Sequence, residues 1–272
     1  MSTASLIIRT TLPILVATLA ACGGIEEDTT LRPVGPTCLG EPGEPGAPGG
    51  AGGRVTVRYG ALQQASPAEL LDALDVVGGG GGAPGAHGEP DPAGAAPARP
   101  GADGRDGSPS LWQDPGLALD LSGVEPDDAL LVSAGDIYLK TKLLQGPLRV
   151  RRVVVAPGVS LQLSGGWVIE ADEVLVSPGA SIVVSDRGEK TKDVLGSAVG
   201  HHGGDLVLRA RKLELYGDII ASGEAGATGE AGGDGGQVLV EAETLLLGDG
   251  AGIHAAGGAG GAGADGQACS VE

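Results

Sequence analysis

A short motif occurs twice between residues 203 and 263 and restricts the fold more than any other feature of the chain. Each copy begins with two glycines and an alternating apolar strand, at 203–210 and again at 235–242. It then passes through a second apolar triplet into glycine at every third position. One such unit cannot bury its apolar side chains alone, so successive units must stack and share a core. The repeat therefore predicts an all-β fold, a parallel β-helix (solenoid) carrying Gly-X-Y arms of the polyproline or polyglycine type.

A second repeat supports this interpretation. The segment Val-Val-Val-Ala-Pro-Gly-Val at 153–159 recurs as Val-Leu-Val-Ser-Pro-Gly-Ala at 174–180. Proline lacks the amide hydrogen that a sheet needs, so each Pro-Gly pair predicts a tight bend between short strands. An antiparallel sandwich is the alternative, but it favours Asn-Gly or Asp-Gly hairpin turns, and the corners here are mostly Pro-Gly and Gly-Gly. Residues at equivalent positions of the turns are expected to point inward in columns: Val153, Val155, Val174, Val176, Leu213, Leu215, Leu245 and Leu247.

The apolar residues of this chain are small. It has no Phe, two Trp and three Tyr, whereas Gly accounts for 52 of its 272 residues. Large aromatic side chains normally supply much of the buried area of a compact core. Here Val, Leu, Ile and Ala must supply it, and the β-branched members of this set favour an extended backbone. Stacked ladders of small aliphatic side chains suit the narrow interior of a β-helix.

The N-terminus has the pattern of a processing signal. Arg9 precedes a short apolar run at 12–19, and the run closes with Leu-Ala-Ala-Cys. This ending resembles the lipobox of bacterial lipoproteins, which implies that residues 1–21 are a signal peptide and that Cys22 carries the lipid. The run is shorter than the ~20 residues that span a bilayer. The alternatives are an ordinary secretory signal and a membrane helix that contains a cysteine. Gly23 stands where inner-membrane retention signals usually place Asp, so the resemblance implies an outer-membrane protein facing the cell surface or the periplasm.

The chain after the signal divides by composition into five segments. Residues 22–53 are expected to be a tether and a collagen-like spacer, 54–77 a partial strand and helix module, 78–110 a Gly/Pro-rich arm, 111–268 the β-helical domain and 269–272 a tail. Four or five Gly-X-Y triplets are too few to hold a collagen trimer, so the spacer is expected to be an extended polyproline-type segment. The arm is expected to be flexible unless it packs against its sister arms.

The module at 54–77 repeats the double-glycine strand opening and then differs from the other modules. The sequence Ser-Pro-Ala-Glu at 66–69 is a capping box with Pro at the first helical position. It predicts about two turns of inserted helix, with Leu70, Leu71 and Leu74 on its apolar face.

Two cysteines follow the lipid site, Cys38 near the start of the mature chain and Cys269 near its end. A disulfide is chemically permitted outside the cytoplasm, and here it would join the two ends of the chain. Two free thiols on mobile tails are the alternative, because sequence spacing does not determine disulfide geometry.

Parallel β-helices often belong to polysaccharide lyases and hydrolases, which need grouped carboxylates and basic side chains. The nearest such group comprises Asp186, Arg187, Lys190 and His202. The alternative, which we favour, is a solvated loop of alternating charge. His201 and His202 are adjacent, so they point in opposite directions in an extended segment, and no third residue stands at a metal-ligand spacing. We therefore expect no catalytic residue, metal or cofactor.

The formal net charge of −18 argues against nucleic acid as a partner. In composition the chain is similar to glycine-rich lipoproteins of Gram-negative bacteria and, more distantly, to the β-helical stalks of autotransporter adhesins. That resemblance implies a non-catalytic, lipid-anchored envelope or surface protein with a structural or adhesive role. Its partners would be the membrane, through the lipid, and an envelope or extracellular glycan or protein; the oligomeric state stays open. The alternative function is binding or degradation of acidic polysaccharide through the loop from Asp186 to His202.

Overall fold

Two parallel sheets dominate the computed structural model, which describes residues 40–89, 97–124, 128–133, 137–140, 146–186 and 200–269. In spatial order sheet A contains β3 (Ser108–Gln113), β1 (Arg54–Gln63), β12 (Gln237–Leu247), β10 (Leu206–Leu215), β8 (Trp167–Val176), β6 (Leu148–Val155) and β4 (Ala129–Val132). Sheet B contains β2 (Leu74–Asp75), β13 (Gly252–His254), β11 (Asp218–Ile220), β9 (Ser181–Ser185), β7 (Ser160–Ser164) and β5 (Ile137–Lys140).

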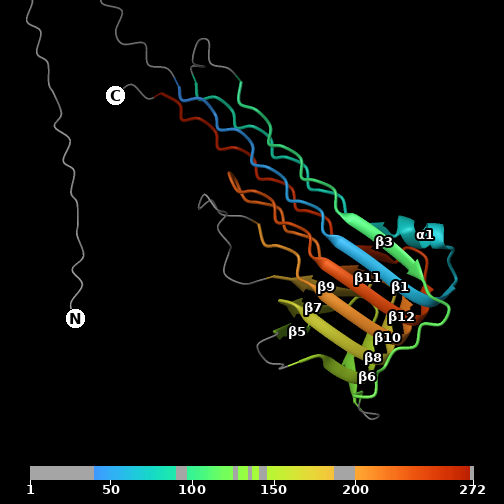
Figure 1. Ribbon diagram of the computed structural model, residues 1–272. Coiled ribbons are helices and arrows are strands. Elements are labelled where there is room, and N and C mark those ends of the chain that lie inside the picture. The colour runs from blue at the N-terminus through green and yellow to red at the C-terminus, as the bar shows by residue number, and fades with distance from the viewer. Residues whose placement is uncertain are drawn as a thin grey trace, which may run out of the picture. The chain divides into compact units, whose positions relative to one another are not determined.

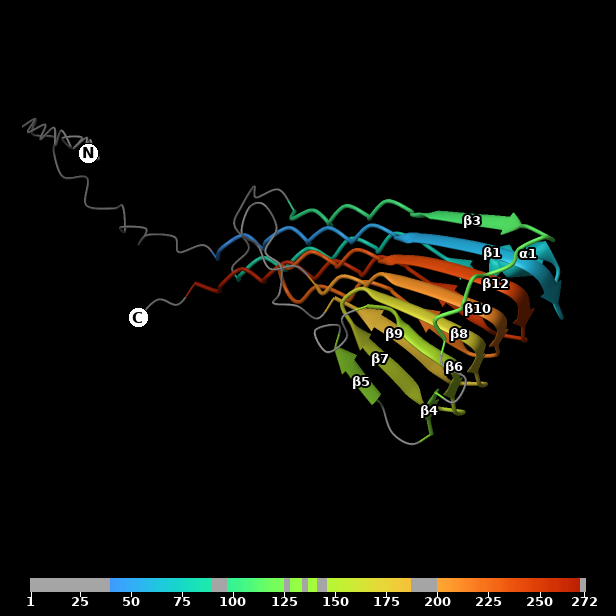
Figure 2. The same ribbon diagram turned by 60° about the horizontal axis from the view of Figure 1, so that its bottom comes forward.

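From β4 to β13 consecutive strands along the chain alternate between the two sheets, so each pass of the chain adds one strand to each sheet (Figures 1 and 2). β1 and β2 alternate in the same way, whereas β3 and β4 both belong to sheet A. Within both sheets the paired strands run parallel. The expected all-β character is confirmed. The parallel pairing rules out the antiparallel sandwich for the described strands.

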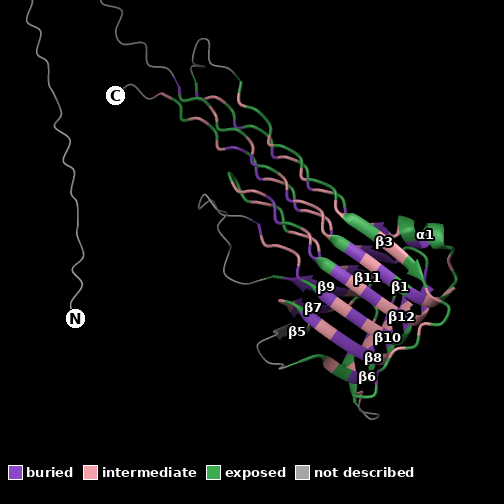
Figure 3. Cartoon of the chain, in the orientation of Figure 1, coloured by how far each residue is buried: buried purple, intermediate pink, exposed green. Residues whose placement is uncertain are grey.

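The strands of sheet A bend in the middle. At the bend, the alternation of inward-facing and outward-facing side chains shifts by one residue. In β10 the adjacent residues Arg211 and Lys212 are both exposed, whereas Ala210 and Leu213 on either side are fully buried. A pleated strand cannot expose two adjacent side chains on one flat face, so this position is a corner. The corner lets one long strand cover two sides of the core (Figure 3).

The core is a set of aliphatic columns, as the repeats predicted. The eight residues expected to point inward are each 6% exposed or less. Val174 lies between Val153 and Leu213 in register, and Leu213 lies next to Leu245. Each layer buries its apolar surface against the layers on both sides, which is the main source of stability for such a fold.

The order of the layers differs from the order of the chain. Strands β4, β6, β8, β10 and β12 follow one another in sheet A, but the next strand is β1, and β3 lies beyond it at the edge. Val55 of the N-terminal module therefore packs in register with Val238 of the C-terminal module. The chain returns from β3 to β4 through residues 114–124, which cross the outer face of sheet A (Figure 2). We call these residues the crossing segment.

Glycine-rich segments continue from the sheets as a set of extended arms that lie side by side (Figures 1 and 2). In the first arm, 40–53, the amides of residues 41, 44, 47 and 50 donate to carbonyls at 267, 264, 261 and 258 over 2.8–2.9 Å. The carbonyls of the same four residues accept from amides at 88, 85, 82 and 79. This three-residue period is that of a polyproline-type helix.

Residues 40–53 are thus hydrogen-bonded to several other segments of the folded unit. The Gly/Pro-rich arm was expected to be ordered only if it packed against the other arms. Its described parts, 78–89 and 97–107, are hydrogen-bonded to neighbouring arms. Close approach explains the composition: a Cβ atom at Gly46 would lie 1.9 Å from the carbonyl oxygen of Gly82, and one at Gly53 would lie 1.9 Å from that of Gly236. Only glycine fits at such positions.

Carboxylates cap amides on the outer arms. Asp103 accepts from the Gly81 amide at 2.9 Å and Asp106 from the Gly78 amide at 3.0 Å. These side chains satisfy amides that would otherwise offer an edge to another chain, which is a common protection of exposed edges.

The predicted helix forms as α1 (Pro67–Asp72), with the complete capping box. The hydroxyl of Ser66 accepts from the Glu69 amide, and the Glu69 carboxylate accepts from the Ser66 amide at 2.7 Å. This backbone hydrogen bond is the main cause of the lowered pKa of Glu69. Leu70 and Leu74 are buried as expected, but Leu71 is 46% exposed and that assignment was wrong. Leu74 lies beyond the helix, in β2, so the expectation that it shares the apolar face of the helix was also wrong. Leu70 and Leu71 are adjacent on the helix and point about 100° apart, so this short helix turns only Leu70 to the core. No helix among the described residues is long and apolar enough to span a membrane.

Candidate functional site

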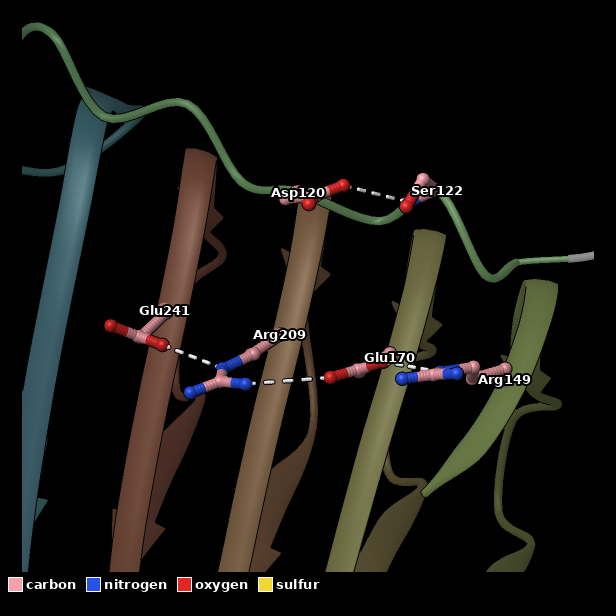
Figure 4. A network of polar contacts seen from close by, with 6 residues as sticks. All are labelled: Asp120, Ser122, Arg149, Glu170, Arg209 and Glu241. Atoms are coloured by element: carbon pink, nitrogen blue, oxygen red, sulfur yellow. Dashed lines mark hydrogen bonds and ion pairs between the residues drawn. The ribbon is translucent and has the colours of Figure 1, made fainter. Parts of the chain in front are cut away.

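Five charged side chains form a row on the outer face of sheet A, one from each of five neighbouring strands. The backbone register places them at equivalent positions of β1, β12, β10, β8 and β6. The row reads Arg58, Glu241, Arg209, Glu170 and Arg149, with alternating sign, and Figure 4 shows the last four. We call it the charged row.

Each carboxylate of the charged row lies between two arginines. Arg209 Nε donates to Glu241 Oε2 at 2.8 Å, and its Nη1 donates to Glu170 Oε1 at 3.4 Å. Glu170 also accepts from Arg149 Nε at 2.7 Å, and Glu241 lies 3.5 Å from Arg58 Nη1. The hydrogen bond to Glu241 is the largest cause of the raised pKa of Arg209. The side chains of Glu170 and Glu241 are only 10% and 14% exposed, so the row is partly sheltered from water.

The crossing segment runs beside this row (Figure 4) and is held to sheet A by hydrogen bonds. At its start Asp114 Oδ2 accepts from Arg58 Nη2 at 2.6 Å. In its middle the Leu119 amide donates to Glu243 Oε1 at 2.8 Å. Leu121 is 3% exposed, and the Ser122 amide donates to Asp120 Oδ1 at 3.1 Å. The segment therefore forms an ordered wall over sheet A.

A cleft of about 400 Å³ lies between the crossing segment and the charged row. Its floor includes Arg58, Arg209 and Glu241, and its wall includes Asp114 and Leu117. The volume falls in the range of small-molecule sites, and the lining combines a few convergent polar groups with aliphatic carbon, as such sites do. Among the described residues, no group of three His, Cys, Asp or Glu side chains is placed to hold a metal ion. A ligand in this cleft would be recognised through hydrogen bonds and through the fit of its shape.

The crossing segment is expected to loosen in acid. Arg58 donates a hydrogen bond to Asp114, which is the largest cause of that carboxylate's pKa falling below its ordinary value of 3.8. A carboxyl group with a depressed folded-state pKa contributes stability above its unfolded pKa, and that contribution is lost as the pH falls through the folded value. We expect Asp114→Asn to flatten the fall in stability below about pH 4. Chemical denaturation between pH 2 and pH 7 measures this; an unchanged acid profile would show that Asp114 does not hold the segment.

The sequence-predicted loop residues are partly brought together. The amide of Asp186 donates to the carbonyl of His202 at 2.9 Å, so the two ends of the loop meet. His202 Nδ1 accepts from the Asp234 amide at 2.8 Å, which ties the ring to a glycine arm. Arg187 and Lys190 lie outside the described residues.

The cysteine predictions fall mostly outside the described residues, which exclude Cys22 and Cys38. Cys269 is disulfide-bonded, and its amide donates to the carbonyl of Glu89 at 3.0 Å. Its pairing with Cys38 stays a prediction.

Sequence reasoning did not identify the charged row. A signal was present, because Arg209 and Glu241 occupy the same position of the repeated module and have opposite charge. The sequence did not predict that Arg58 lies next to Glu241, because this contact depends on the order in which the modules stack. The cleft was missed for the same reason.

Comparison with models of protein families, with curated proteins and with solved structures finds no match to this chain.

Proposed function

We propose that this chain is a lipid-anchored, non-catalytic protein of the outer membrane, facing the cell surface or the periplasm, with a structural or adhesive role. In this proposal the two sheets form a parallel β-helix and the glycine arms extend it as a stiff rod. The observation that carries the proposal is the hydrogen-bonded packing of the arms, in which the first arm bonds to arms on several sides at three-residue intervals.

The arms support a mechanical role. A single Gly-X-Y segment is a flexible chain, because nothing offsets the entropy of ordering it. Packing several such segments with regular hydrogen bonds makes them a rigid extension of the sheets. A lipid at Cys22 would then attach this object to the membrane through residues 23–39. A rigid, membrane-attached structure of this kind is better suited to act as a spacer at the membrane surface than to bind and release a reactant.

The charged row supports the non-catalytic part of the proposal. A general acid or base needs a pKa near the working pH, and such groups are usually made by burial or like-charge neighbours. Glu170 and Glu241 instead each form ion pairs with two arginines, which is the pattern of a structural ion-pair network.

Lipidation and orientation are testable together. With the full chain expressed in a Gram-negative host, we expect radiolabelled palmitate to enter the protein and Cys22→Ala to abolish both the label and its recovery with membranes. A Cys269→Ala variant is the matched control and should keep the label. Protease added to intact cells distinguishes the surface from the periplasmic orientation. An unlabelled protein that is secreted whole would contradict the proposal.

The second candidate is binding or cleavage of acidic polysaccharide by the loop between Asp186 and His202. The hydrogen bond between Asp186 and His202 favours it, since it brings two of the proposed loop residues next to each other. We expect Asp186→Asn and Arg187→Ala to abolish polyuronate turnover or binding if the loop acts this way. Unchanged turnover in both variants, or none in the unmodified protein, would remove this candidate.

A further inference from the structure

Trp112 is exposed to an unusual degree for a tryptophan in a sheet. Its exposed fraction is 65%, whereas the second tryptophan of the chain, Trp167, is only 4% exposed. Trp112 lies on the edge strand β3, directly across from Arg58 in the register of the sheet. It therefore extends the charged row by one position, with an aromatic surface in place of a charge.

The floor of the neighbouring cleft offers both donors and acceptors. A guanidinium carries five N–H groups, and the contacts described above engage only two nitrogen atoms each of Arg58 and Arg209. The carboxylate oxygens of Glu241 and Asp114 each have more lone pairs than the contacts described above use. Donors and acceptors alternate along the floor at the strand spacing of about 4.8 Å.

Aliphatic carbon faces this polar floor. Leu117, Leu119 and Leu121 belong to the crossing segment, line the cleft and are less exposed than their neighbours Ala118 and Asp120. The alternation indicates that the three leucines turn toward the sheet. The cleft thus has one face suited to hydroxyl groups and one suited to C–H groups, and Trp112 lies beside it.

We propose that the cleft and Trp112 together bind a neutral oligosaccharide of one to a few sugar rings. Sugar hydroxyls both donate and accept, so they can use the alternating arginines and carboxylates without displacing the ion pairs. The C–H face of one ring would pack on the leucines, and that of the next on the indole of Trp112.

The charge of the lining selects against an acidic sugar. Two arginines, Arg58 and Arg209, face three carboxylates, Asp114, Asp120 and Glu241. A uronate would add a fourth carboxylate to a site whose positive charges are already paired, at a cost in desolvation and repulsion. This site is therefore distinct, in place and in ligand, from the acidic-polysaccharide loop at Asp186. It goes beyond the proposed structural role and does not depend on lipidation at Cys22.

Titration of the complete mature chain with neutral oligosaccharides tests the proposal, with tryptophan fluorescence and calorimetry as readouts. We expect saturable binding of at least one neutral oligosaccharide and a change in the emission of the exposed tryptophan. Trp112→Ala should weaken binding by roughly tenfold, which corresponds to losing about 1.4 kcal/mol. The exposure of Trp112 makes this variant safe for folding.

Leu131→Ala is the matched control, because Leu131 is 61% exposed on β4, the strand at the opposite edge of the same sheet. It should bind as the unmodified protein does. Leu117→Trp, which fills the cleft, should abolish binding while circular dichroism stays unchanged. The proposal is overturned by the absence of binding to neutral sugars at millimolar concentration, by full affinity in Trp112→Ala or Leu117→Trp, or by a preference for polyuronates. None of these outcomes bears on membrane anchoring, so the two proposals fail separately.

Discussion

Gly79→Ala is expected to destabilise the protein by about 3 kcal/mol or more, because the added methyl group has no room. A Cβ atom at this position would lie 1.9 Å from the carbonyl oxygen of Gly258 on another arm. Gly79 also donates to Gly50 and accepts from Gly104, both at 2.8 Å, so moving its arm would strain bonds to neighbouring arms. For a chain of this size the melting temperature should fall by roughly 6–12 °C.

Gly80→Ala is the control, and it lies one residue away in the same arm. Nothing lies within 4 Å of a Cβ atom built there, and the residue is exposed. The replacement should be neutral or stabilise the fold by up to about 1 kcal/mol, since alanine restricts the unfolded chain more than glycine does. Differential scanning calorimetry of both variants measures the two melting temperatures and tests this prediction. Equal melting temperatures would mean that the arms are not packed as described.

Tyr59→Ala should cost about 3–5 kcal/mol and detach the N-terminal module. Tyr59 is 1% exposed on β1 and lies in register with Ala242, in a column that Ala171 and Ala210 continue. Its buried ring therefore lies at the junction between two modules that are not neighbours along the chain. Removing the ring leaves a cavity at that junction.

The location of the effect makes this prediction specific. Amide hydrogen exchange should speed up in β1, β3 and the β12 edge that faces them, while β6 and β8 stay protected. Tyr59→Phe keeps the ring and should cost no more than about 1.5 kcal/mol. A uniform loss of protection across sheet A in Tyr59→Ala would show that the N-terminal module does not open separately.

The local elements followed from local chemistry. The capping box at residues 66–69 requires only neighbouring atoms, so the sequence predicted α1 correctly. The two repeats predicted the core columns because residues at equivalent positions of stacked units must pack together, and Val153, Val174 and Leu213 do so.

The arms were harder to predict because their order is collective. Considered alone, residues 40–53 have the composition of an extended polyproline-type spacer. They are ordered because amides and carbonyls from several distant segments meet them at every third residue. Glycine at those positions was visible in the sequence, but the neighbours that require it were not.

The sequence by itself therefore determined which residues form strands and which side of each strand is apolar. The tertiary structure alone decided that the N-terminal module stacks on the C-terminal one, and with it the pairing of Arg58 with Glu241, the path of the crossing segment and the cleft beside Trp112. The physical reason is that strand patterns arise from neighbours along the chain. The choice of which module stacks on which depends on complementary charge and shape between segments that are about 180 residues apart in the sequence.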